Sequence, residues 1–581
     1  MSTPYLNGIS FGLGMDGLSA VMVVTVAIVT LAVLVFAAGE FRSVRFFGLV
    51  LLFAAAMLVT VTATTLLTLL MAWEVMGATS YALIGFWWRE PRRATSGLVA
   101  FLTTRAADLG LYLAAGAALA GGARGLDLDR LASLPDGWRD VVAAGLVVAA
   151  LGKSAQLPFS FWLSRAMDGP SPVSALLHSA TMVAAGAYLL LRMENLLDAT
   201  SWAAVTVAWA GAATALLLGA VAVVQRDLKQ LLAASTCAQV GLMVLAAGTA
   251  GVAAGTWQLV AHAFTKSLLF LCAGAWLTAL GTKDLTELRG AARRHRFVGV
   301  MFTVGAASLA GLPPLSLWAA KDQVLATAAR ESVPLYVVGL AAAVLSAAYA
   351  GRALALVWAN TDGTDSVDRA ARALAVAPPG AGEQGESTVR YGRAGGEERP
   401  ARPQLAALPV LAAGAAGLGL LALPGLWARA ARVVPGGAGP AWWELVVSGV
   451  LALVVTGLTA RAVSRRDLPA PAPLLGWLGL EGLTRTVVVR PTLVAADALA
   501  RFDDRAVAGS VRATAAVGTA FARLVDRRVE WSVDGAVRLV ARWFRALGRL
   551  ARRPQTGQLH HYYAQAVVVL AALAVLLLLV R

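Results

Sequence analysis

Four ionisable side chains lie inside long apolar stretches of this 581-residue sequence: Glu74, Lys153, Lys266 and Lys321. A charge at the centre of a membrane costs about 2.5–3.5 kcal/mol on the insertion scale, so each one needs a partner or a function. An acid and several desolvated lysines in a hydrated interior can exchange protons near neutral pH, and a neighbouring charge that moves can switch each site. The set therefore predicts a path for proton transfer, with structural ion pairs as the alternative.

Two histidines and one further acid extend the candidate path. His262 precedes Lys266 by one helical turn, and His178 lies in a separate apolar stretch. Both are candidate proton relays, and a hydrogen-bonded core histidine is the alternative for each. Asp322 follows Lys321, which is close to a helix end and for which snorkelling to the interface is the alternative.

For three more charged residues the first interpretation is a structural role rather than a catalytic one. Arg105 and Asp108 are spaced i and i+3, so they are expected to neutralise each other within one helix, and both are kept as candidate site residues. Lys229, within Arg226-Asp227-Leu228-Lys229, begins an apolar stretch on the basic side. Its position favours a topological role over a catalytic one.

The elements that position these residues must be membrane-spanning helices. Hydrophobic residues make up 58% of the chain and charged residues 14%, and a soluble domain of this length cannot shelter so much apolar surface. A helix needs about 20 apolar residues to cross the hydrocarbon layer. The predicted fold class is an all-α polytopic membrane protein with about fourteen spans, near residues 16–38, 45–63, 64–88, 96–121, 139–163, 170–192, 202–224, 229–250, 255–279, 297–320, 333–358, 404–427, 441–463 and 562–580.

The basic residues predict the orientation of these spans. Most Lys and Arg lie in the odd-numbered loops, beginning with Glu40–Arg45, so these loops are expected in the cytoplasm and both termini outside. The net charge of +16 then reflects topology and contact with anionic lipids. No nucleic-acid-binding motif accompanies it, so we expect no nucleic-acid partner.

Two short motifs recur in the same order. Pro158-x-Ser160-x-Trp162-x-x-Arg165 returns as Pro314-x-Ser316-x-Trp318-x-x-Lys321, and Leu98–Arg105 resembles Leu259–Lys266. The copies are five spans apart, and an odd shift places them in opposite orientations, as in the inverted repeats of transporters. Proline in a span removes a backbone hydrogen bond, so two broken helices are predicted around Pro158 and the Pro313-Pro314 pair.

The C-terminal part predicts a surface arm. Arginines from Arg538 to Arg552 recur at helical spacing with apolar residues between them, which is typical of an amphipathic helix along a membrane or against neighbouring subunits. Pro491 and Gly535 predict that the arm is interrupted. The expected organisation is an N-terminal span (1–44), a first repeat (45–192), a second, inverted repeat (193–358), a flexible cytoplasmic loop (359–403), a two-helix hairpin (404–463), a lateral amphipathic region (464–561) and a final span (562–581).

No cofactor is expected in this chain. Its two cysteines, Cys237 and Cys272, fall short of the four thiolates that an iron–sulfur cluster usually needs. Gly12–Gly17 matches G-x-G-x-x-G, but no strand is expected before it and a span follows, so it does not predict a nucleotide site. The N-terminus has no basic region or cleavage site typical of a signal peptide.

Five motifs together resemble the antiporter-like subunits of respiratory complex I (NADH:quinone oxidoreductase), and among them the L type (chain 5), a group related to Mrp-type antiporter subunits. They are Trp73-Glu74 with Gly77, Gly152–Pro158, Asp168–His178, His262–Lys266 and Lys321-Asp322. The resemblance runs from about Gly14 to the C-terminus, and residues 475–580 resemble the lateral helix and last span of the L type.

The resemblance implies a proton channel built from two linked half-channels. Glu74, Lys153, Lys266 and Lys321 take its central positions, and NADH, FMN, iron–sulfur clusters and quinone are expected in partner subunits that line up along the lateral helix. The resemblance departs in two places. The family usually has two more spans before the one near Asp16, and Gln258 stands where relatives often have a second histidine.

Three functions remain open from the sequence. The first is a proton-translocating subunit that couples redox-driven charge shifts to pumping, in which Glu74 and Lys153 form an ion pair that opens and closes. The second is a cation/proton antiporter or inorganic-carbon uptake subunit with the same fold. The third is an anchor in which the buried charges only pair.

Overall fold

The computed structural model describes residues 2–6, 9–360, 399–435, 439–465 and 470–580. Their contacts divide the chain into two units, Met1–Leu483 and Thr484–Arg581, which are described separately below. Most of the predicted flexible loop 359–403 lies outside the described residues.

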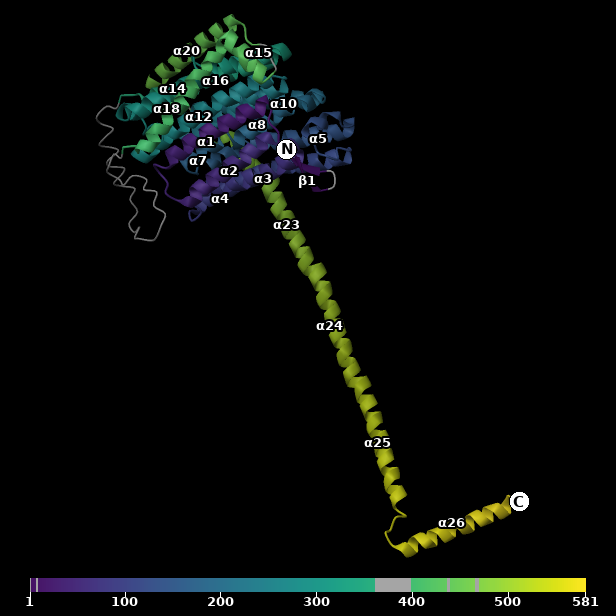
Figure 1. Ribbon diagram of the computed structural model, residues 1–581. Coiled ribbons are helices and arrows are strands. Elements are labelled where there is room, and N and C mark those ends of the chain that lie inside the picture. Colours follow the sequence, from purple (N-terminus) through teal and green to yellow (C-terminus); the bar gives the residue numbers. More distant parts are fainter. Residues whose placement is uncertain (1, 7–8, 361–398, 436–438, 466–469, 581) are drawn as a thin grey trace, which may run out of the picture. The chain divides into compact units, whose positions relative to one another are not determined.

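The first unit begins with a short antiparallel hairpin, β1 (Ser2–Leu6) and β2 (Ile9–Gly12), which the all-α expectation did not include. A layered bundle of long helices follows. Figure 1 shows α1, α12 and α18 side by side in this bundle, and these three pack on one another. The helices as far as the second predicted repeat are α1 (Gly17–Ala37), α2 (Val44–Thr62), α3 (Leu66–Ile84), α4 (Pro91–Ala120), η1 (Leu128–Ser133), α5 (Asp136–Lys153), α6 (Phe161–Ala166), α7 (Ser171–Leu177), α8 (Met182–Arg192), α9 (Glu194–Asp198) and α10 (Ser201–Val224).

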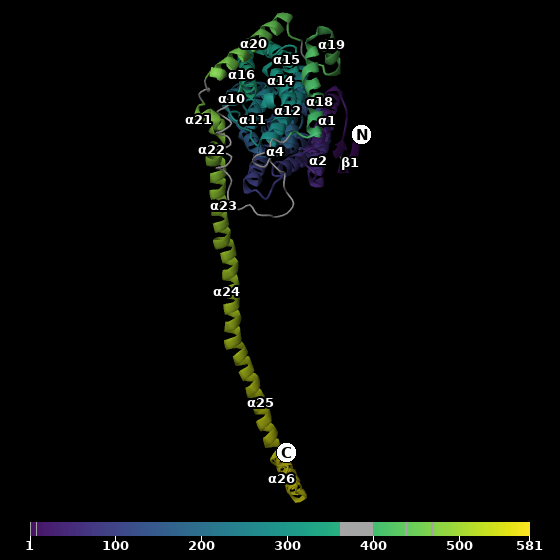
Figure 2. The ribbon, with the colours of Figure 1, turned by 90° about the vertical axis from the view of Figure 1, so that its left-hand side faces the viewer.

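The remaining helices of the first unit complete the bundle, and the last of them precede the arm in the sequence. Figure 2, turned by 90°, shows α18 and α20 on different sides of α14 and α15. The elements are α11 (Leu228–Gly248), α12 (Val252–Leu280), α13 (Ala291–Arg294), α14 (Arg296–Ala310), α15 (Ser316–Glu331), α16 (Val333–Val357), α18 (Arg402–Gly417), η2 (Leu418–Ala422), α19 (Pro424–Val433), α20 (Trp442–Arg465), α21 (Ala472–Leu475), η3 (Trp477–Gly479) and α22 (Leu480–Thr484).

The predicted spans coincide with helices. Twelve helices in the described part of the chain are long and apolar enough to cross a membrane. The other two predicted spans, 139–163 and 297–320, fall on α5 with α6 and on α14 with α15, which are shorter because each pair is interrupted. The polytopic helical fold is thus confirmed, while the inverted relationship of the two repeats stays a prediction.

Both interruptions lie where the prolines predicted them. The helical backbone stops after Lys153 and resumes at Phe161, with Pro158 between. It stops again after Ala310 and resumes at Ser316, around Pro313 and Pro314. A further break that the sequence did not predict separates α7 from α8 at His178–Thr181.

Contacts between loops confirm that odd-numbered loops share one end of the bundle. Asp227 pairs with Lys283 at 2.8 Å, and Arg92 pairs with Asp168 at 3.2 Å. Arg165 makes a two-point ion pair with Glu481, at 2.9 and 2.5 Å. These residues belong to the loops after spans three, five, seven, nine and thirteen. Odd-numbered loops therefore lie at one end of the bundle, as the predicted spans require.

The even-numbered loops gather at the other end together with the N-terminal residues. Arg192 Nη1 donates to Asp16 Oδ2 at 2.7 Å, and the Thr249 and Thr327 hydroxyls are 3.3 Å apart. Gly17 lies directly against the Val433 carbonyl, where an added Cβ would be only 1.7 Å away. A proton crossing the bundle must therefore pass from one set of loops to the other.

Close glycine contacts hold two helix pairs together. An ideal Cβ on Gly110 of α4 would lie 2.3 Å from the Gly145 oxygen of α5, and a Cβ on Gly145 would lie 2.3 Å from the Gly110 oxygen. Gly211 of α10 and Gly241 of α11 meet in the same way, at 2.5 and 2.6 Å. Small residues let membrane helices approach this closely, because lipid supplies no hydrophobic drive between them.

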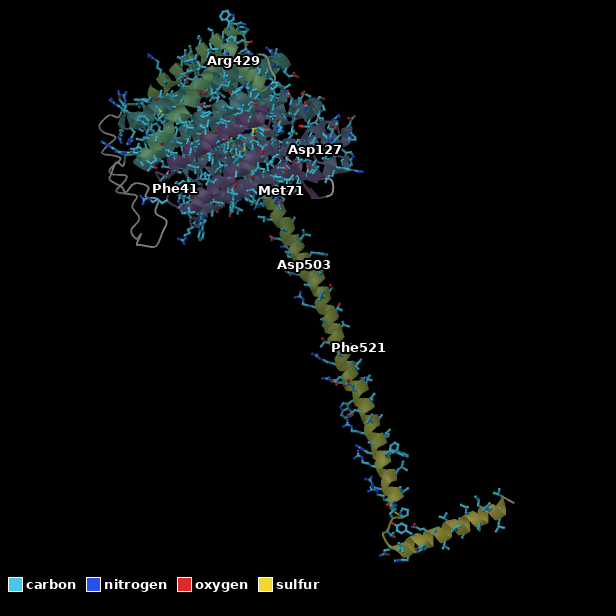
Figure 3. All side chains as sticks on the ribbon, viewed as in Figure 1. Phe41, Met71, Asp127, Arg429, Asp503 and Phe521 are labelled. Carbon is cyan, nitrogen blue, oxygen red and sulfur yellow. The ribbon has the colours of Figure 1, made fainter. Side chains whose placement is uncertain are left out.

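The second unit contains the predicted arm and the last span. Figure 3 shows side chains such as Asp503 and Phe521 projecting outward from this rod, and Phe521 is 66% exposed. The elements are η4 (Arg485–Val489), α23 (Arg490–Phe502), η5 (Asp503–Val507), α24 (Ala508–Leu524), η6 (Val525–Glu530), α25 (Trp531–Arg552) and α26 (Leu559–Leu579).

The prediction that Pro491 and Gly535 interrupt the arm is wrong. Helical backbone runs without a break from Arg485 to Arg552, and three of its segments (η4, η5 and η6) are π turns. Pro491 is the second residue after the first of them. A π turn widens the helix locally, and this removes the clash between a proline ring and the preceding turn. Gly535 lies inside α25, where it weakens the helix without ending it.

Candidate proton-transfer site

Lys153 forms a sealed ion pair with Asp108. It is the last residue of α5, and its Nζ donates to Asp108 Oδ2 at 2.9 Å, with side chains 0% and 3% exposed. Trp73 Nε1 donates to the other oxygen, Oδ1, at 2.6 Å. The Lys153 ammonium also lies 5.1 Å from the centre of the Trp73 ring, a cation–π contact. Asp108 therefore has both oxygens occupied by buried donors.

Glu74 is paired with Arg105 rather than with Lys153. The Arg105 guanidinium donates to Glu74 Oε1, to which the Tyr112 hydroxyl also donates at 3.0 Å. The Glu74 side chain is 26% exposed and that of Arg105 34%, so this pair is less buried than the sequence indicated.

The structure pairs these four residues differently from the sequence prediction: Arg105 is not paired with Asp108, and the Glu74–Lys153 pair, predicted to open and close, is open. Arg105 and Asp108 do share α4, but they point to different neighbours, because α4 packs against both α3 and α5. Lys153 still lies near the Glu74 helix, since its Nζ is 3.4 Å from the place where a Gly77 Cβ would be. Gly77 is thus the small residue that gives Lys153 room beside α3, one turn from Glu74.

The two histidines lie together at the helix break between α7 and α8. His178 is fully buried between Trp162 and Phe270, with ring centroids 6.3 and 6.0 Å away. Neither of its ring nitrogens has a hydrogen-bond partner among the described residues, which argues against a hydrogen-bonded core histidine. His262 Nε2 lies 3.4 Å from the His178 carbonyl oxygen.

Lys266 is held by neutral groups. Its Nζ donates to the Leu232 carbonyl at 3.0 Å and to the Ser235 hydroxyl of α11. The side chain is 0% exposed, and within the described residues no carboxylate is in ion-pair contact with it. A buried amine with only neutral acceptors is suited to gaining and losing a proton, because no fixed counter-charge holds it in one state.

Lys321 has the same kind of environment. Its Nζ donates to the Leu309 carbonyl at 2.7 Å and to the Ser346 hydroxyl at 2.5 Å, so it is held inside the bundle rather than snorkelling. Asp322 is 5% exposed and accepts from the Ser448 hydroxyl at 2.5 Å. The two adjacent residues thus face different partners.

A neutral polar chain runs from the helix that carries Lys266 to Lys321. Gln258 Nε2 donates to Gln239 Oε1 at 3.0 Å, Gln239 Nε2 donates to the Tyr349 hydroxyl at 2.9 Å, and Tyr349 in turn has Ser346 as a hydrogen-bonding neighbour. This chain leads from α12, the Lys266 helix, to the Ser346 hydroxyl that holds Lys321. Gln258, which departs from the family pattern, begins it.

Lys229 lies inside the bundle, which its position in the sequence did not indicate. It is 3% exposed, and its Nζ donates to the Gly169 carbonyl at 2.9 Å. It lines a charged cavity of about 310 Å³ at the odd-loop end, together with Asp168 and Lys283. Its place next to Arg226 and Asp227 is typical of a topological lysine, and no sequence signal separates that from a lysine turned inward.

Glu40, in the loop between α1 and α2, faces the same lysine. Its Oε2 is sealed from solvent and has no hydrogen-bond partner among the described residues. Burial raises the pKa of the Glu40 carboxyl from 4.5 to about 7, and the positive charge of Lys229 opposes part of this rise. No signal in the sequence distinguishes this glutamate from other loop acids.

The Glu40→Gln variant is expected to gain thermal stability over the natural protein as pH rises. Between pH 4.5 and 7 the folded protein binds more protons at Glu40 than the unfolded chain does, so folding is weakened as pH rises through this window. Glutamine removes this titration. In detergent, the difference in Tm between variant and natural protein should be larger at pH 8 than at pH 5. Glu90→Gln, at an exposed carboxylate paired with Arg93, is the control and should give no such trend; a Glu40→Gln difference that is equal at both pH values would contradict the prediction.

The fold and the site together define a class: a multi-span membrane protein in which buried lysines, two histidines and a neutral polar chain lie in the interior beside interrupted helices. One comparison finds a family that matches part of the chain. Residues 63–346 match the family described as NADH:quinone oxidoreductase/Mrp antiporter, transmembrane. This stretch is therefore a domain of that family, and the resemblance predicted from the motifs is confirmed.

Individual relatives carry related names. The chain is 36% identical over 376 residues to the chloroplastic NAD(P)H-quinone oxidoreductase subunit 5 of Zygnema circumcarinatum, covering 61% of this chain and 53% of that protein. It is 35% identical over 371 residues to the NADH-quinone oxidoreductase subunit L of Campylobacter jejuni, covering 61% of each. The chain thus spans about half the length of the curated relatives that it matches.

Two solved structures have similar folds. The Mrp complex from Dietzia sp. aligns with a TM-score of 0.70 and 25% identity, over 90% of this chain and 57% of that one. Respiratory complex I from Thermus thermophilus with bound NADH aligns with a TM-score of 0.61 and 22% identity, over 78% of this chain and 89% of that one; this second likeness concerns the fold.

Proposed function

We propose that this chain is a proton-translocating membrane subunit of an NADH:quinone oxidoreductase-type complex. The observation that carries the proposal is the contrast between the lysines. Lys153 is neutralised by Asp108, whereas Lys266 and Lys321 are buried with carbonyl and hydroxyl acceptors. The names of the relatives support the same class.

The geometry supports a charge-driven transfer. Glu74 with Arg105 and Lys153 with Asp108 are neighbouring pairs on α3, α4 and α5. A charge change in a partner subunit alters the relative stability of these two ion pairs. In response the Lys153 ammonium moves from Asp108 toward the Glu74 side of α3, where Gly77 leaves space. That shift changes the field at His178 and His262, and a proton passes to Lys266 and then toward Lys321. Lys229 supplies protons from the odd-loop end.

The redox chemistry belongs to partners in this proposal. NADH, FMN, iron–sulfur clusters and quinone are bound by other subunits, and neighbouring membrane subunits and lipids line the arm. The apolar face of α25 supports this, because Trp543 and Phe544 are 66% and 71% exposed. The complex lies in a bacterial plasma membrane with odd loops in the cytoplasm and both termini outside.

A second candidate is a cation/proton antiporter subunit of the Mrp type. The likeness to the Dietzia Mrp complex favours it, since that alignment covers 90% of this chain. Such a subunit would exchange cations for protons without any electron donor, so the requirement for NADH separates the two functions.

Replacing Lys266 by methionine tests the proposal. In inverted membrane vesicles that carry the assembled complex, Lys266→Met is expected to lower NADH-driven proton uptake by about tenfold or more, because the path loses its central proton acceptor. NADH oxidation by an artificial acceptor should be unchanged. Arg130→Met, at a loop arginine whose side chain is 78% exposed, is the control and should pump normally. Normal pumping by Lys266→Met would leave only the anchor interpretation, and a proton flux that needs Na⁺ but not NADH would favour the antiporter.

A further inference from the structure

Two adjoining cavities lie beside Lys321. The first offers about 20 Å³ to the centres of water molecules and is lined by Lys321, Asp322 and Ser448. The second offers about 40 Å³ and is lined by Asp322 and Ser448 together with Glu444 and Tyr336. They share Asp322 and Ser448, and together they occupy the space between α15, α16 and α20, which we call the α20 cleft. One water centre needs about 10–15 Å³, so the cleft has room for a few waters.

The α20 wall of this cleft is polar, whereas the other residues between Trp442 and Val455 of this helix are apolar or glycine. Val446, Val450 and Leu453 are each more than half exposed, as expected for a lipid-facing helix. Glu444 and Ser448 are spaced i and i+4, so they lie on one face, and that face is turned to α15. A helix that only filled the lipid boundary would have no reason to carry a carboxylate and a hydroxyl there.

Local structure accounts for only part of this pattern. Glu444 Oε2 accepts from the backbone N–H of Ala441 at 2.8 Å, which caps the start of α20. The other carboxylate oxygen is not used by that cap. Ser448 donates to Asp322 rather than only to its own helix. Capping explains neither this cross-helix bond nor the cleft between the two acids.

The cleft points to the even-loop end of the bundle. Tyr336 lies near the start of α16 and Glu444 near the start of α20, and both helices begin after even-numbered loops. Arg330, at the end of α15, reaches the Gly439 carbonyl at 3.5 Å across the same end. Lys229 and its cavity lie at the opposite, odd-loop end. The cleft thus leads from Lys321 to the end that a translocated proton must reach.

We propose that the α20 cleft is the proton outlet of this chain, and that the Ser448 hydroxyl and the Glu444 carboxylate transfer the proton through it. This rests on the proposed function. The Lys321 ammonium gives its proton to the Asp322 carboxylate through water in the cleft, which leaves a neutral amine and a carboxylic acid. The Asp322 acid passes the proton on through the Ser448 hydroxyl or a water to the Glu444 carboxylate, which releases it to the outer solvent. Both α20 residues lie beyond the stretch 63–346 that matches the family.

The first test asks whether the cleft is accessible to water from the outer side of the membrane. The Ser448→Cys variant of the full chain is treated, in sealed right-side-out vesicles, with a charged thiosulfonate that does not cross membranes. We expect it to be labelled, whereas the Leu453→Cys variant, on the lipid face of the same helix, should stay unlabelled. The natural Cys237 and Cys272 are buried and give a low background. An unreactive Ser448→Cys variant would overturn the proposal.

The second test measures flux. Ser448→Val fills the shared part of the cleft with methyl groups and removes its hydroxyl, and Glu444→Gln removes its terminal acceptor. Each is expected to lower NADH-driven proton uptake into inverted vesicles by about tenfold or more. Thr456→Val on the same helix and Glu331→Gln at the same end are matched controls and should pump normally.

The outcomes separate the outlet from the function as a whole. If Lys266→Met blocks pumping while Ser448→Val and Glu444→Gln both pump normally, the outlet is elsewhere and the proposed function stands. If Lys266→Met also pumps normally, the proposed function itself fails and the outlet fails with it. Normal pumping by Ser448→Thr, which keeps a hydroxyl, together with weak pumping by Ser448→Val would confirm that the hydroxyl carries the proton.

Discussion

Replacing Asp108 by leucine is expected to destabilise the protein by about 3–5 kcal/mol, because it leaves the Lys153 ammonium buried without its counter-charge. Asp108 also accepts from Trp73, so the substitution orphans a second buried donor. Thermal unfolding of the detergent-solubilised protein measures the effect. The double variant Asp108→Leu with Lys153→Met should regain most of the lost stability, since replacing both members of a buried pair by apolar groups is often nearly neutral.

The double variant also separates stability from function. If the pair serves only to hold α4 and α5 together, the restored protein should pump protons normally in the assembled complex. On the proposed function it should fold and assemble but lower NADH-driven proton uptake strongly, because Lys153 is gone. Stability that stays low in the double variant would contradict the idea that an unpaired charge causes the damage.

Placing valine at Gly145 is expected to prevent the protein from accumulating in the membrane. A Cβ there would lie 2.3 Å from the Gly110 oxygen and 3.1 Å from the Ala114 Cβ. Backbone atoms cannot turn aside as a flexible side chain can, so α4 and α5 must separate, at a cost of about 3 kcal/mol or more. That separation also pulls apart Asp108 and Lys153, which these two helices carry.

Gly116→Val is the matched control, since Gly116 is an exposed residue of α4 with no atom within 4 Å of an added Cβ. Fluorescence-detected size-exclusion chromatography of both variants, fused to a fluorescent protein, gives the comparison. A monodisperse Gly145→Val protein at normal yield would show that α4 and α5 tolerate a wider spacing than the structure has.

The sequence predicted the features that depend on one helix at a time. Apolar length locates the spans, and proline locates the breaks after Lys153 and after Ala310, because a missing N–H acts on its own helix. The burial of Lys266 and Lys321 follows for the same reason, since each lies well inside an apolar run.

Features that depend on how two helices face each other could not be predicted. The choice of Asp108 over Glu74 as the partner of Lys153 is set by the rotation of α4 between α3 and α5. Lys229 was assigned to topology because the same residues, Arg226 and Asp227, precede a lysine whether it turns inward or outward. Gly110 and Gly145 are two of 57 glycines, and only the packed structure distinguishes them from the others.

The buried lysines differ in whether a carboxylate forms an ion pair with them, and this difference limits how many protons the path can hold at once. At Lys153 an arriving proton brings the local charge from −1 to zero, because the Asp108 carboxylate balances it. At Lys266 an arriving proton adds a whole positive charge to a medium that screens poorly, and this charge repels a second one on Lys321. Transport along this part of the chain must therefore proceed as single occupancy, each hop waiting until the next centre has emptied.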